Sequence, residues 1–275
     1  MEERDKNVED YSVINGEGTS LRKAQLRLLE MLMEFDRICK KHGIDYYLSS
    51  GNCLGAMRHG GFIPWDDDMD VDVMYKDYKK LHRILERELP PQYVLQTPRT
   101  DKGYYHIFTR IVDLNSKMHY SSSNRTRRRL KYDGLFLDIF PLQAGINHKL
   151  KKRFDRFFVP VFRYSRGVDG SPKKQLISKF LWPFFKVIAD VLNFVTASRL
   201  FSVFHKDDIT HIYGTNILPK VKYSNVFPSK PMLFEDKWVQ GPANPDAYLR
   251  EIFGDYMEVP PPERRKTHAV KIDVF

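Results

Sequence analysis

Residues 62–73 read FIPWDDDMDVDV and carry five carboxylates within seven positions, in a chain of 275 residues whose formal net charge is +10. Carboxylates this close repel one another, so something has to offset their charge. Apolar residues alternate with aspartates over the second half of the stretch, and this period of two predicts a β-strand. Asp68, Asp70 and Asp72 are therefore expected to project from one face of that strand as an acidic row.

A divalent cation would remove the repulsion, since carboxylate oxygens are ligands that suit Mg²⁺ and Mn²⁺. Two carboxylates two residues apart, Asp68 and Asp70, can chelate one ion, and Asp66 lies just before them. A third metal ligand is expected from Asp138, which interrupts the apolar run GLFLDIFPL (134–142) and is costly to bury unless it is paired or metal-bound. Two other interpretations stay open: the acidic row is a solvated strand face, and Asp138 is a turn or capping carboxylate.

The segment SSGNCLGAMRHG (49–60), just upstream, has the features of a phosphate-binding turn. Gly51 and Asn52 predict a turn in which Asn52 caps the following helix. A helix N-terminus offers free N–H groups and the positive end of the helix dipole to phosphate. Arg58 and His59 are then expected to contact phosphate oxygens, unless Arg58 only neutralises the acids. The chain has no GxxxxGK[ST] motif, which excludes a Walker-type loop.

The composition, with 42% hydrophobic and 29% charged residues, is that of a globular protein. Two cysteines, Cys39 and Cys53, exclude a disulfide framework and a four-thiolate zinc site, and indicate a reducing, cytoplasmic setting. The charged start MEERDKNVED is unlike a signal peptide, and no apolar run of about 18 residues predicts a transmembrane helix. A pI near 9.4 leaves nucleotides, anionic lipid headgroups, phosphorylated glycans and nucleic acid open as partners.

Helical and strand patterns alternate over residues 20–145, which favours an α/β (α+β) fold with a mixed sheet and flanking helices. A flexible segment over residues 1–18 is expected to precede a single domain over residues 19–275. The predicted elements are helices that begin at Ser20 and Asn52, a helix over 76–89, and strands over 45–49, 69–73, 93–96, 105–113 and 134–142.

Residues 148–208 are basic and aromatic and predict a helical insertion in this domain. The stretch 175–204 is strongly apolar but contains internal charges, so it is expected to form one or two helices, bent near Pro183, that do not span a membrane. These helices either pack on the core or lie on a membrane surface, because basic residues flank the aromatic ones.

Three stretches together carry a family resemblance: YYLSSGNCLGAMRHGGFIPWDDDMDV (46–71), FLDIFPL (136–142) and FEDKWVQGPANPDAYLREIFGDYMEVPPPERR (234–265). They resemble the signature of the LicD-type phosphotransferases, which include the fukutin-related proteins. The resemblance implies a nucleotidyltransferase-like fold with Gly51 as the turn glycine, Asp68 and Asp70 as the chelating pair and Asp138 as the third carboxylate. One departure is Ser50, which stands where the family usually has glycine.

The resemblance also implies an activity: a phospho-alcohol, foremost phosphocholine, passes from a CDP-alcohol donor to a hydroxyl of a cell-surface glycan, and CMP is released. Mg²⁺ or Mn²⁺ held by the three aspartates would bridge the donor phosphates. Either Asp138 or Asp66 is expected to take the acceptor proton. Arg110 lines the cleft or only pairs strands.

Two basic or C-terminal groups have weaker assignments. The arginine-rich loop 125–131 binds an anionic acceptor or lipid headgroup, or is a solvated loop. Tyr256, Arg265 and His268 close the site or pack beside it. The acceptor is expected to be a glycan or lipid-linked glycan, met in the cytoplasm or in peripheral contact with the inner face of the cytoplasmic membrane.

Two other classes of function compete with the phosphotransferase. The first is a catalytically silent transferase fold that binds an anionic polymer or a membrane. The second is a nucleotidyltransferase that acts on nucleic acid, but no RNA-binding motif accompanies the acidic site, so no nucleic-acid partner is expected.

Overall fold

A computed structural model describes residues 10–121, 130–197, 208–215 and 220–275. The helices are α1 (Ser12–Asn15), α2 (Ser20–His42), α3 (Ser50–His59), α4 (Tyr75–Glu88), α5 (His148–Ser165), α6 (Pro172–Ala197), α7 (Tyr223–Val226) and α8 (Pro245–Phe253), with a 3₁₀ turn, η2, at Pro262–Arg264. The strands are β1 (Tyr46–Leu48), β2 (Met69–Met74), β3 (Tyr93–Gln96), β4 (Thr109–Asp113), β5 (Ser116–His119), β6 (Phe136–Ala144), β7 (Asp208–His211), β8 (Val221–Lys222), β9 (Lys230–Phe234), β10 (Lys237–Gly241) and β11 (Lys271–Val274).

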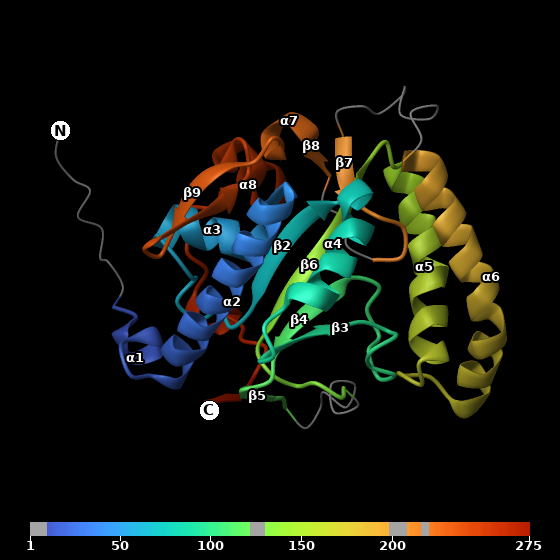
Figure 1. Cartoon of the computed structure of the whole chain (residues 1–275), viewed down its shortest axis with the longest axis horizontal. Helices are drawn as coiled ribbons and strands as arrows, with labels where there is room; N and C mark the ends of the chain where they lie inside the picture. Colours follow the sequence, from blue (N-terminus) through green and yellow to red (C-terminus); the bar gives the residue numbers. More distant parts are fainter. Residues whose placement is uncertain (1–9, 122–129, 198–207, 216–219) are drawn as a thin grey trace.

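A mixed sheet of seven strands forms the centre of the molecule, with the order β1-β2-β6-β4-β3 and with β7 and β8 continuing from β6 (Figure 1). The central pair, β2 and β6, is parallel, and the other pairs in this sheet are antiparallel. Strand β6 is long enough to pair with β4 along its first half and with β7 along its last three residues. The predicted α+β fold with a mixed sheet and flanking helices is confirmed.

The main core forms on the face of the sheet opposite to the acidic row. Val71 and Val73 of β2 are fully buried in one apolar cluster with Leu28 of α2 and Leu81 of α4. These two helices lie across the sheet in Figure 1. The alternation of β2 thus separates its apolar side chains, which pack on the helices, from its aspartates.

The long helix α2 begins and ends at recognisable capping residues. Its N-cap is Thr19, whose side chain accepts a hydrogen bond from the backbone N–H of Arg22, so the helix is capped one residue before the predicted Ser20. Gly43 ends it in the left-handed conformation at φ 61°, as a glycine allows. This places the chain for β1, which begins three residues later.

Two segments differ from the sequence prediction. The strand predicted over 105–113 begins only at Thr109; before it, the rings of Tyr105, His106 and Phe108 contact one another, with the Tyr105 and His106 centroids 4.3 Å apart. From residue 10 on, the segment predicted to be flexible forms α1, and Tyr11 packs edge-on against Trp65 at 5.9 Å between ring centroids. Aromatic contacts with residues far away in the sequence hold both segments, as between Tyr11 and Trp65 and between Phe108 and Phe140. A short-range sequence pattern does not reveal such contacts.

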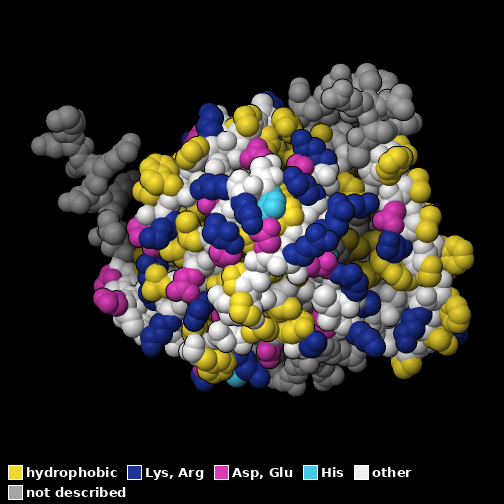
Figure 2. All heavy atoms as spheres, in the orientation of Figure 1, with side chains coloured by type: hydrophobic (Ala, Val, Ile, Leu, Met, Phe, Trp, Pro, Cys, Tyr) yellow, Lys and Arg dark blue, Asp and Glu magenta, His cyan; other side chains and the backbone are white. Residues whose placement is uncertain are grey.

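Helices α5 and α6 lie in the stretch predicted to be a helical insertion and form a hairpin beside the sheet (Figure 1). The hairpin has its own small apolar cluster of Phe158, Phe162 and Ala189, against which Trp182 packs. Helix α6 runs through Pro183 as one helix. Figure 2 shows hydrophobic side chains gathered on the outer side of the molecule over this hairpin.

Candidate active site

The sheet register brings two of the predicted acids together. In the parallel pair of β2 and β6, Asp70 is the direct partner of Asp138, so the two side chains leave the same face of the sheet side by side. Asp68 lies just before β2 rather than on it, because the strand begins at Met69. Asp70 and Asp138, together with Asp66 and Asp68 just before β2, form one group of acids, which we call the acidic edge. Their roles as metal ligands stay a prediction.

The acids at this edge are held in an environment that disfavours their charge. Burial, together with the charges of Asp68, Asp138 and Asp66, raises the pKa of Asp70 well above its usual value. Burial and the neighbouring Asp68 likewise raise the pKa of Asp66 well above its usual value. Burial raises the pKa of Asp68 too, although the charge of His268 acts in the opposite direction. The cluster therefore has an excess of negative charge that a cation would offset.

Asp138 has a cation of its own. Arg110, its register partner on β4, donates from Nε and Nη2 to the two carboxylate oxygens at 2.6 and 2.7 Å. Both side chains are buried, and the guanidinium also lies 3.6 Å from the centroid of the Phe136 ring. Burial acts to lower the pKa of Arg110, but the charge and hydrogen bonds of Asp138 outweigh it and raise the pKa. Arg110 thus orients Asp138, a contact closer than the cleft-lining position that the sequence suggested.

Asp72 continues the acidic row but has a structural role. Its buried carboxylate accepts a hydrogen bond from Ser49 Oγ at 2.7 Å and lies 2.7 Å from Nε2 of His211 on β7. Ser49 also precedes α3, so Asp72 connects the start of that helix to β2 and β7. Both oxygens of Asp72 are used inside the protein, as are both oxygens of Asp138 in its pair with Arg110, so Asp66, Asp68 and Asp70 are the remaining acids of this group.

Asp67 is fully buried and holds the C-terminal segment. Its carboxylate accepts hydrogen bonds from the backbone N–H of His268 at 2.9 and 3.0 Å and from that of Ala269 at 2.8 Å. The His268 ring places Nδ1 2.9 Å from Asp67 and 3.4 Å from Asp68. The C-terminal segment therefore borders the acidic edge, as the sequence suggested for His268.

Helix α3 begins next to the acids, but not in the way predicted. Its N-cap is Ser49, and Asn52 lies inside the helix, so the prediction that Asn52 caps it is wrong. Asn52 instead donates from Nδ2 to the carbonyl of Asp68 at 3.2 Å and accepts from the backbone N–H of Asp70 at 2.6 Å. The physical reason is the early helix start: Asn52 then points sideways, toward the backbone that precedes β2, rather than along the helix axis.

The two residues before Asn52 allow a close approach of backbone and carboxylate. Ser50 has a left-handed φ of 41°, which explains why a glycine would suit this position. A Cβ on Gly51 would meet Asp66 Oδ2 at 3.3 Å, so the missing side chain makes room for that carboxylate. The N-terminus of α3 and the acidic edge thus face each other, as a site for a metal-bound phosphate requires.

Arg58 and His59, predicted to contact phosphate, are occupied by the C-terminal region in this structure. Arg58 donates from Nη1 to the carbonyls of Tyr256 and Glu258 at 2.8 and 3.0 Å, and from Nε to His59 Nε2 at 3.0 Å. Burial and the charges of Arg58 and Arg265 lower the pKa of His59 to about 4. These contacts hold the segment after α8 against α3, and the phosphate contacts stay a prediction.

The acidic edge has the donor set for a hard divalent cation, although its geometry differs from the simplest expectation. Among the described residues, ligand atoms of Asp66, Asp67 and His268 lie within 4.8 Å of one another. The predicted set of Asp68, Asp70 and Asp138 is not gathered this tightly, and Arg110 bonds both oxygens of Asp138. Asp67 accepts hydrogen bonds from the backbone N–H groups of His268 and Ala269, so it holds the fold, and the metal roles of the other carboxylates stay a prediction.

A small aromatic cavity of about 270 Å³ borders the same face of the sheet. Phe140, two residues after Asp138 on β6, lines it together with Phe108 and His106, whose ring centroids are 4.7 Å apart. Phe108 and Phe140 are 4.5 Å apart, so the rings form a continuous wall. Arg163 also lines this cavity and pairs with Asp169.

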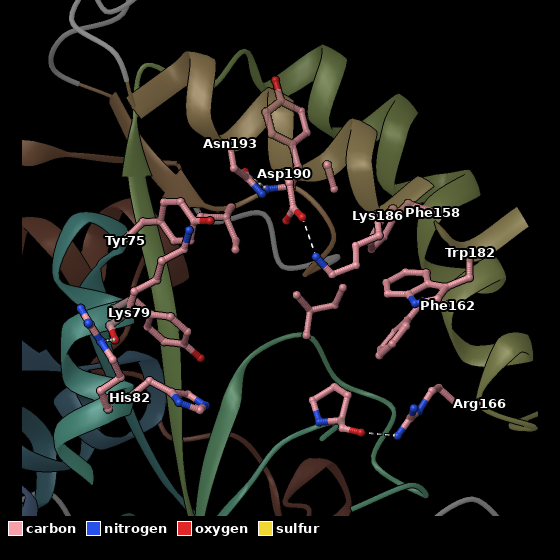
Figure 3. A pocket seen from close by; sticks show the side chains of 17 residues that line it. Tyr75, Lys79, His82, Phe158, Phe162, Arg166, Trp182, Lys186, Asp190 and Asn193 are labelled. Carbon is pink, nitrogen blue, oxygen red and sulfur yellow. Dashed lines mark hydrogen bonds and ion pairs between the residues drawn. The ribbon is translucent and has the colours of Figure 1, made fainter. Parts of the chain in front are cut away.

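A second, larger cavity of about 800 Å³ lies between α4 and the α5–α6 hairpin (Figure 3). Its aromatic and cationic lining includes Tyr75, Lys79, His82, Phe158, Phe162, Arg166, Trp182 and Lys186. Lys186 pairs with Asp190 at 2.5 Å, and Arg166 donates to the carbonyl of Pro98 at 2.8 Å. Asp66, Asp68, Asp70 and Asp138 are not among the residues that line this cavity.

One residue that contacts the acids was not predicted from the sequence, and one predicted loop lies mostly outside the described residues. His211, the partner of Asp72, stands in β7 without a recognisable motif, and only the antiparallel pairing of β6 and β7 brings it to the acids. Most of the arginine-rich loop 125–131 lies outside the described residues.

Comparisons with known proteins indicate a phosphotransferase with a nucleotidyltransferase-type domain. A family model described as LicD/FKTN/FKRP, nucleotidyltransferase domain, matches residues 43–159, the range that contains α3, β2 and β6. The chain is also 26% identical over 266 residues to the lipopolysaccharide cholinephosphotransferase LicD of Haemophilus influenzae. The matched region is 92% of this chain and 97% of that protein. The chain is therefore similar to proteins of the LicD family, over a central domain and over most of its length.

Shorter matches connect the chain to animal members of the family. The ribitol-5-phosphate transferase FKTN of Mus musculus is 40% identical over 53 residues, which are 19% of this chain and 12% of that protein. The ribitol 5-phosphate transferase FKRP of the same species is 49% identical over 35 residues, 13% of this chain and 7% of that protein. Within the described residues, no helix combines the length and apolar character needed to cross a bilayer.

Proposed function

We propose that this phosphotransferase moves phosphocholine from CDP-choline to a hydroxyl of a cell-surface glycan and releases CMP. The observation that carries the proposal is the pairing of Asp70 with Asp138 at the acidic edge, beside the N-terminus of α3. The near full-length match to a cholinephosphotransferase supports choline as the alcohol.

Mg²⁺ or Mn²⁺ held by Asp68, Asp70 and Asp138 would neutralise charge on the donor phosphates. Arg110 orients Asp138, and Asn52 fixes the backbone on both sides of Met69. The α3 N-terminus is positioned to orient the donor phosphates.

Asp66 is the residue we assign as general base. Its carboxylate lies beside Gly51 at the N-terminus of α3, whereas Asp138 is paired with Arg110 and takes the metal role in this scheme. In the reaction, the acceptor oxygen attacks the phosphorus that bears choline, its proton passes to Asp66, and the bond from that phosphorus to the CMP oxygen breaks.

The aromatic cavity beside Phe140 supports a cationic alcohol over a neutral one. Faces of aromatic rings attract quaternary ammonium groups, and His106, Phe108 and Phe140 form such a wall next to the acidic edge. The acceptor that fits the proposal is a glycan or lipid-linked glycan, met in the cytoplasm at the inner face of the cytoplasmic membrane.

The test is CMP release from CDP-choline, measured with Mg²⁺ and a pool of glycan acceptors, with CDP-ribitol and CDP-glycerol as competing donors. We expect CDP-choline to be preferred, chelation of the metal to abolish release, and Asp70→Asn to lower the rate by about 10³-fold, because a lost metal ligand removes most charge stabilisation. Asp77→Asn on α4 is the matched control and should keep the wild-type rate. Full turnover by Asp70→Asn would overturn the metal assignment, and preference for a neutral alcohol would overturn choline.

A further inference from the structure

Helix α6 exposes an apolar face that no part of the described chain covers. Nine large hydrophobic side chains on it are between 41% and 75% exposed. They recur three or four residues apart and so lie on one side of the helix. They are Leu176, Ile177, Phe180, Leu181, Phe184, Val187, Ile188, Val191 and Phe194, and we call this set the outer face of α6. A contiguous exposed apolar surface of this kind marks an interaction site.

The opposite side of α6 is already used. Ser178, Ala189 and Asn193 are buried against the rest of the protein, and Trp182 packs on Phe162 of α5 with ring centroids 4.6 Å apart. The same side lines the large cavity, as Figure 3 shows for Trp182, Lys186 and Asn193. The helix is therefore docked in a defined orientation, and its outer face points away from the domain.

The charges of the hairpin match an anionic surface. All three acidic residues of 148–197 are paired with basic residues of the same hairpin: Asp155 with Lys151, Asp169 with Arg163 and Asp190 with Lys186. Seven exposed basic side chains have no carboxylate partner within the described residues: Lys149, Lys152, Arg153, Arg156, Lys173, Lys174 and Lys179. Lys173, Lys174 and Lys179 lie on α6 itself, along its N-terminal half.

A second copy of the chain fits this surface poorly. A two-fold contact through the outer face would offer the unpaired lysines no acidic partner from the other hairpin, since its three aspartates are already paired. Crossing a bilayer is not an option for α6 either, since no described helix is apolar enough to do so. An amphipathic helix with aromatic and aliphatic residues on one side and lysines beside them instead matches the pattern of helices that lie in the bilayer interface.

We propose that the outer face of α6 inserts into the headgroup region of an anionic lipid bilayer, with the helix parallel to the membrane plane. The phenylalanines at positions 180, 184 and 194 enter the acyl boundary, and the lysines of the hairpin contact lipid phosphates. The inference names the membrane contact of the proposed transferase, but lipid binding is measured without donor or turnover. A failed transfer assay and a failed binding assay are therefore distinguishable.

The experiment is flotation of the full chain with vesicles of phosphatidylcholine, with and without about a third phosphatidylglycerol. We expect binding to the anionic vesicles and weaker binding at high salt, because screening reduces the contribution of the lysines. The triple variant F180S/F184S/F194S should bind at least about tenfold more weakly, since three apolar anchors are lost. The triple variant K173E/K174E/K179E should show a similar loss on anionic vesicles.

The matched control is Trp238→Ser, which removes a side chain that is 63% exposed on β10, away from the hairpin. It should bind vesicles as the wild type does, and all variants should keep the wild-type circular dichroism spectrum. Failure of the wild-type chain to bind anionic vesicles would overturn the proposal, as would unchanged binding by F180S/F184S/F194S. A wild-type dimer that this variant converts to a monomer, by light scattering, would assign the face to a second copy instead.

Discussion

His59 is a neutral histidine between two arginines. Arg58 donates to its ring at 3.0 Å, and burial together with the charges of Arg58 and Arg265 lowers its pKa to about 4. In the unfolded chain the same ring takes up a proton below about pH 6.5. As the pH falls from 6.5 toward 4, the unfolded state therefore gains protons that the folded state does not, and the folded state loses stability.

We expect His59→Gln to remove this part of the pH dependence. Between pH 7 and about pH 4.5 the wild-type free energy of unfolding should fall by about 1 kcal/mol more than that of the variant, after allowance for the partial exposure of the ring. Urea denaturation at a series of pH values measures the difference. His119→Gln, which removes a partly exposed histidine from β5, is a control for general histidine effects. Parallel pH profiles for wild type and His59→Gln would contradict the assignment.

At the scale of strands, one buried ion pair between side chains joins β4 to β6 in addition to their backbone pairing. Arg110 and Asp138 are register partners, and their side chains are 4% and 8% exposed. Removing one partner leaves a buried charge without compensation, which costs about 3–5 kcal/mol. We expect Arg110→Gln and Asp138→Asn each to lower the free energy of unfolding by this amount.

The double variant tests whether the two residues act together. It should be more stable than the sum of the single effects predicts, by more than about 1 kcal/mol, because neither side chain is then left charged and unpaired. The exposed pair Arg250–Asp246 on α8, with N and O 3.0 Å apart, is the control, and its coupling should stay below about 0.5 kcal/mol. Equal couplings for the two pairs would show that burial has no special effect here.

The same strands show how far sequence patterns reach. Alternation around Asp70 predicts β2, and the lone acid in an apolar run predicts that Asp138 is a partner in a buried strand, because both signals are local. The roles of Arg110 and Asn52 could not be predicted. The role of Arg110 depends on the antiparallel register of β4 and β6, and that of Asn52 depends on a helix cap three residues earlier than its capping preference suggests.

For the whole molecule, the site depends on contacts between distant parts of the chain. Arg58 near the start holds the carbonyls of Tyr256 and Glu258, and Asp67 holds His268 and Ala269. The family resemblance of residues 234–265 indicates that the C-terminal region belongs to the site. It does not show which acidic residue binds that region. Separations of about 200 residues leave no periodic signal in a sequence.

We expect Asp67→Ala to release the C-terminal segment. It leaves the N–H groups of His268 and Ala269 without their acceptor, so the free energy of unfolding should fall by about 3 kcal/mol. Limited proteolysis should then cut the region after η2 in the folded variant faster than in the wild type. Asp236→Ala, at an exposed position, should change neither measurement. Equal protection in Asp67→Ala would show that this carboxylate does not hold the segment.

The tie between Asp67 and His268 also has a consequence for biosynthesis. The two residues are 201 positions apart, and ribosomes add roughly 5–20 residues per second, so Asp67 waits roughly 10–40 s for its partners to be translated. During that interval the carboxylate of Asp67 lacks the N–H groups of His268 and Ala269 that it binds in the folded protein. The acidic edge can therefore reach its final arrangement only after these two residues have been translated.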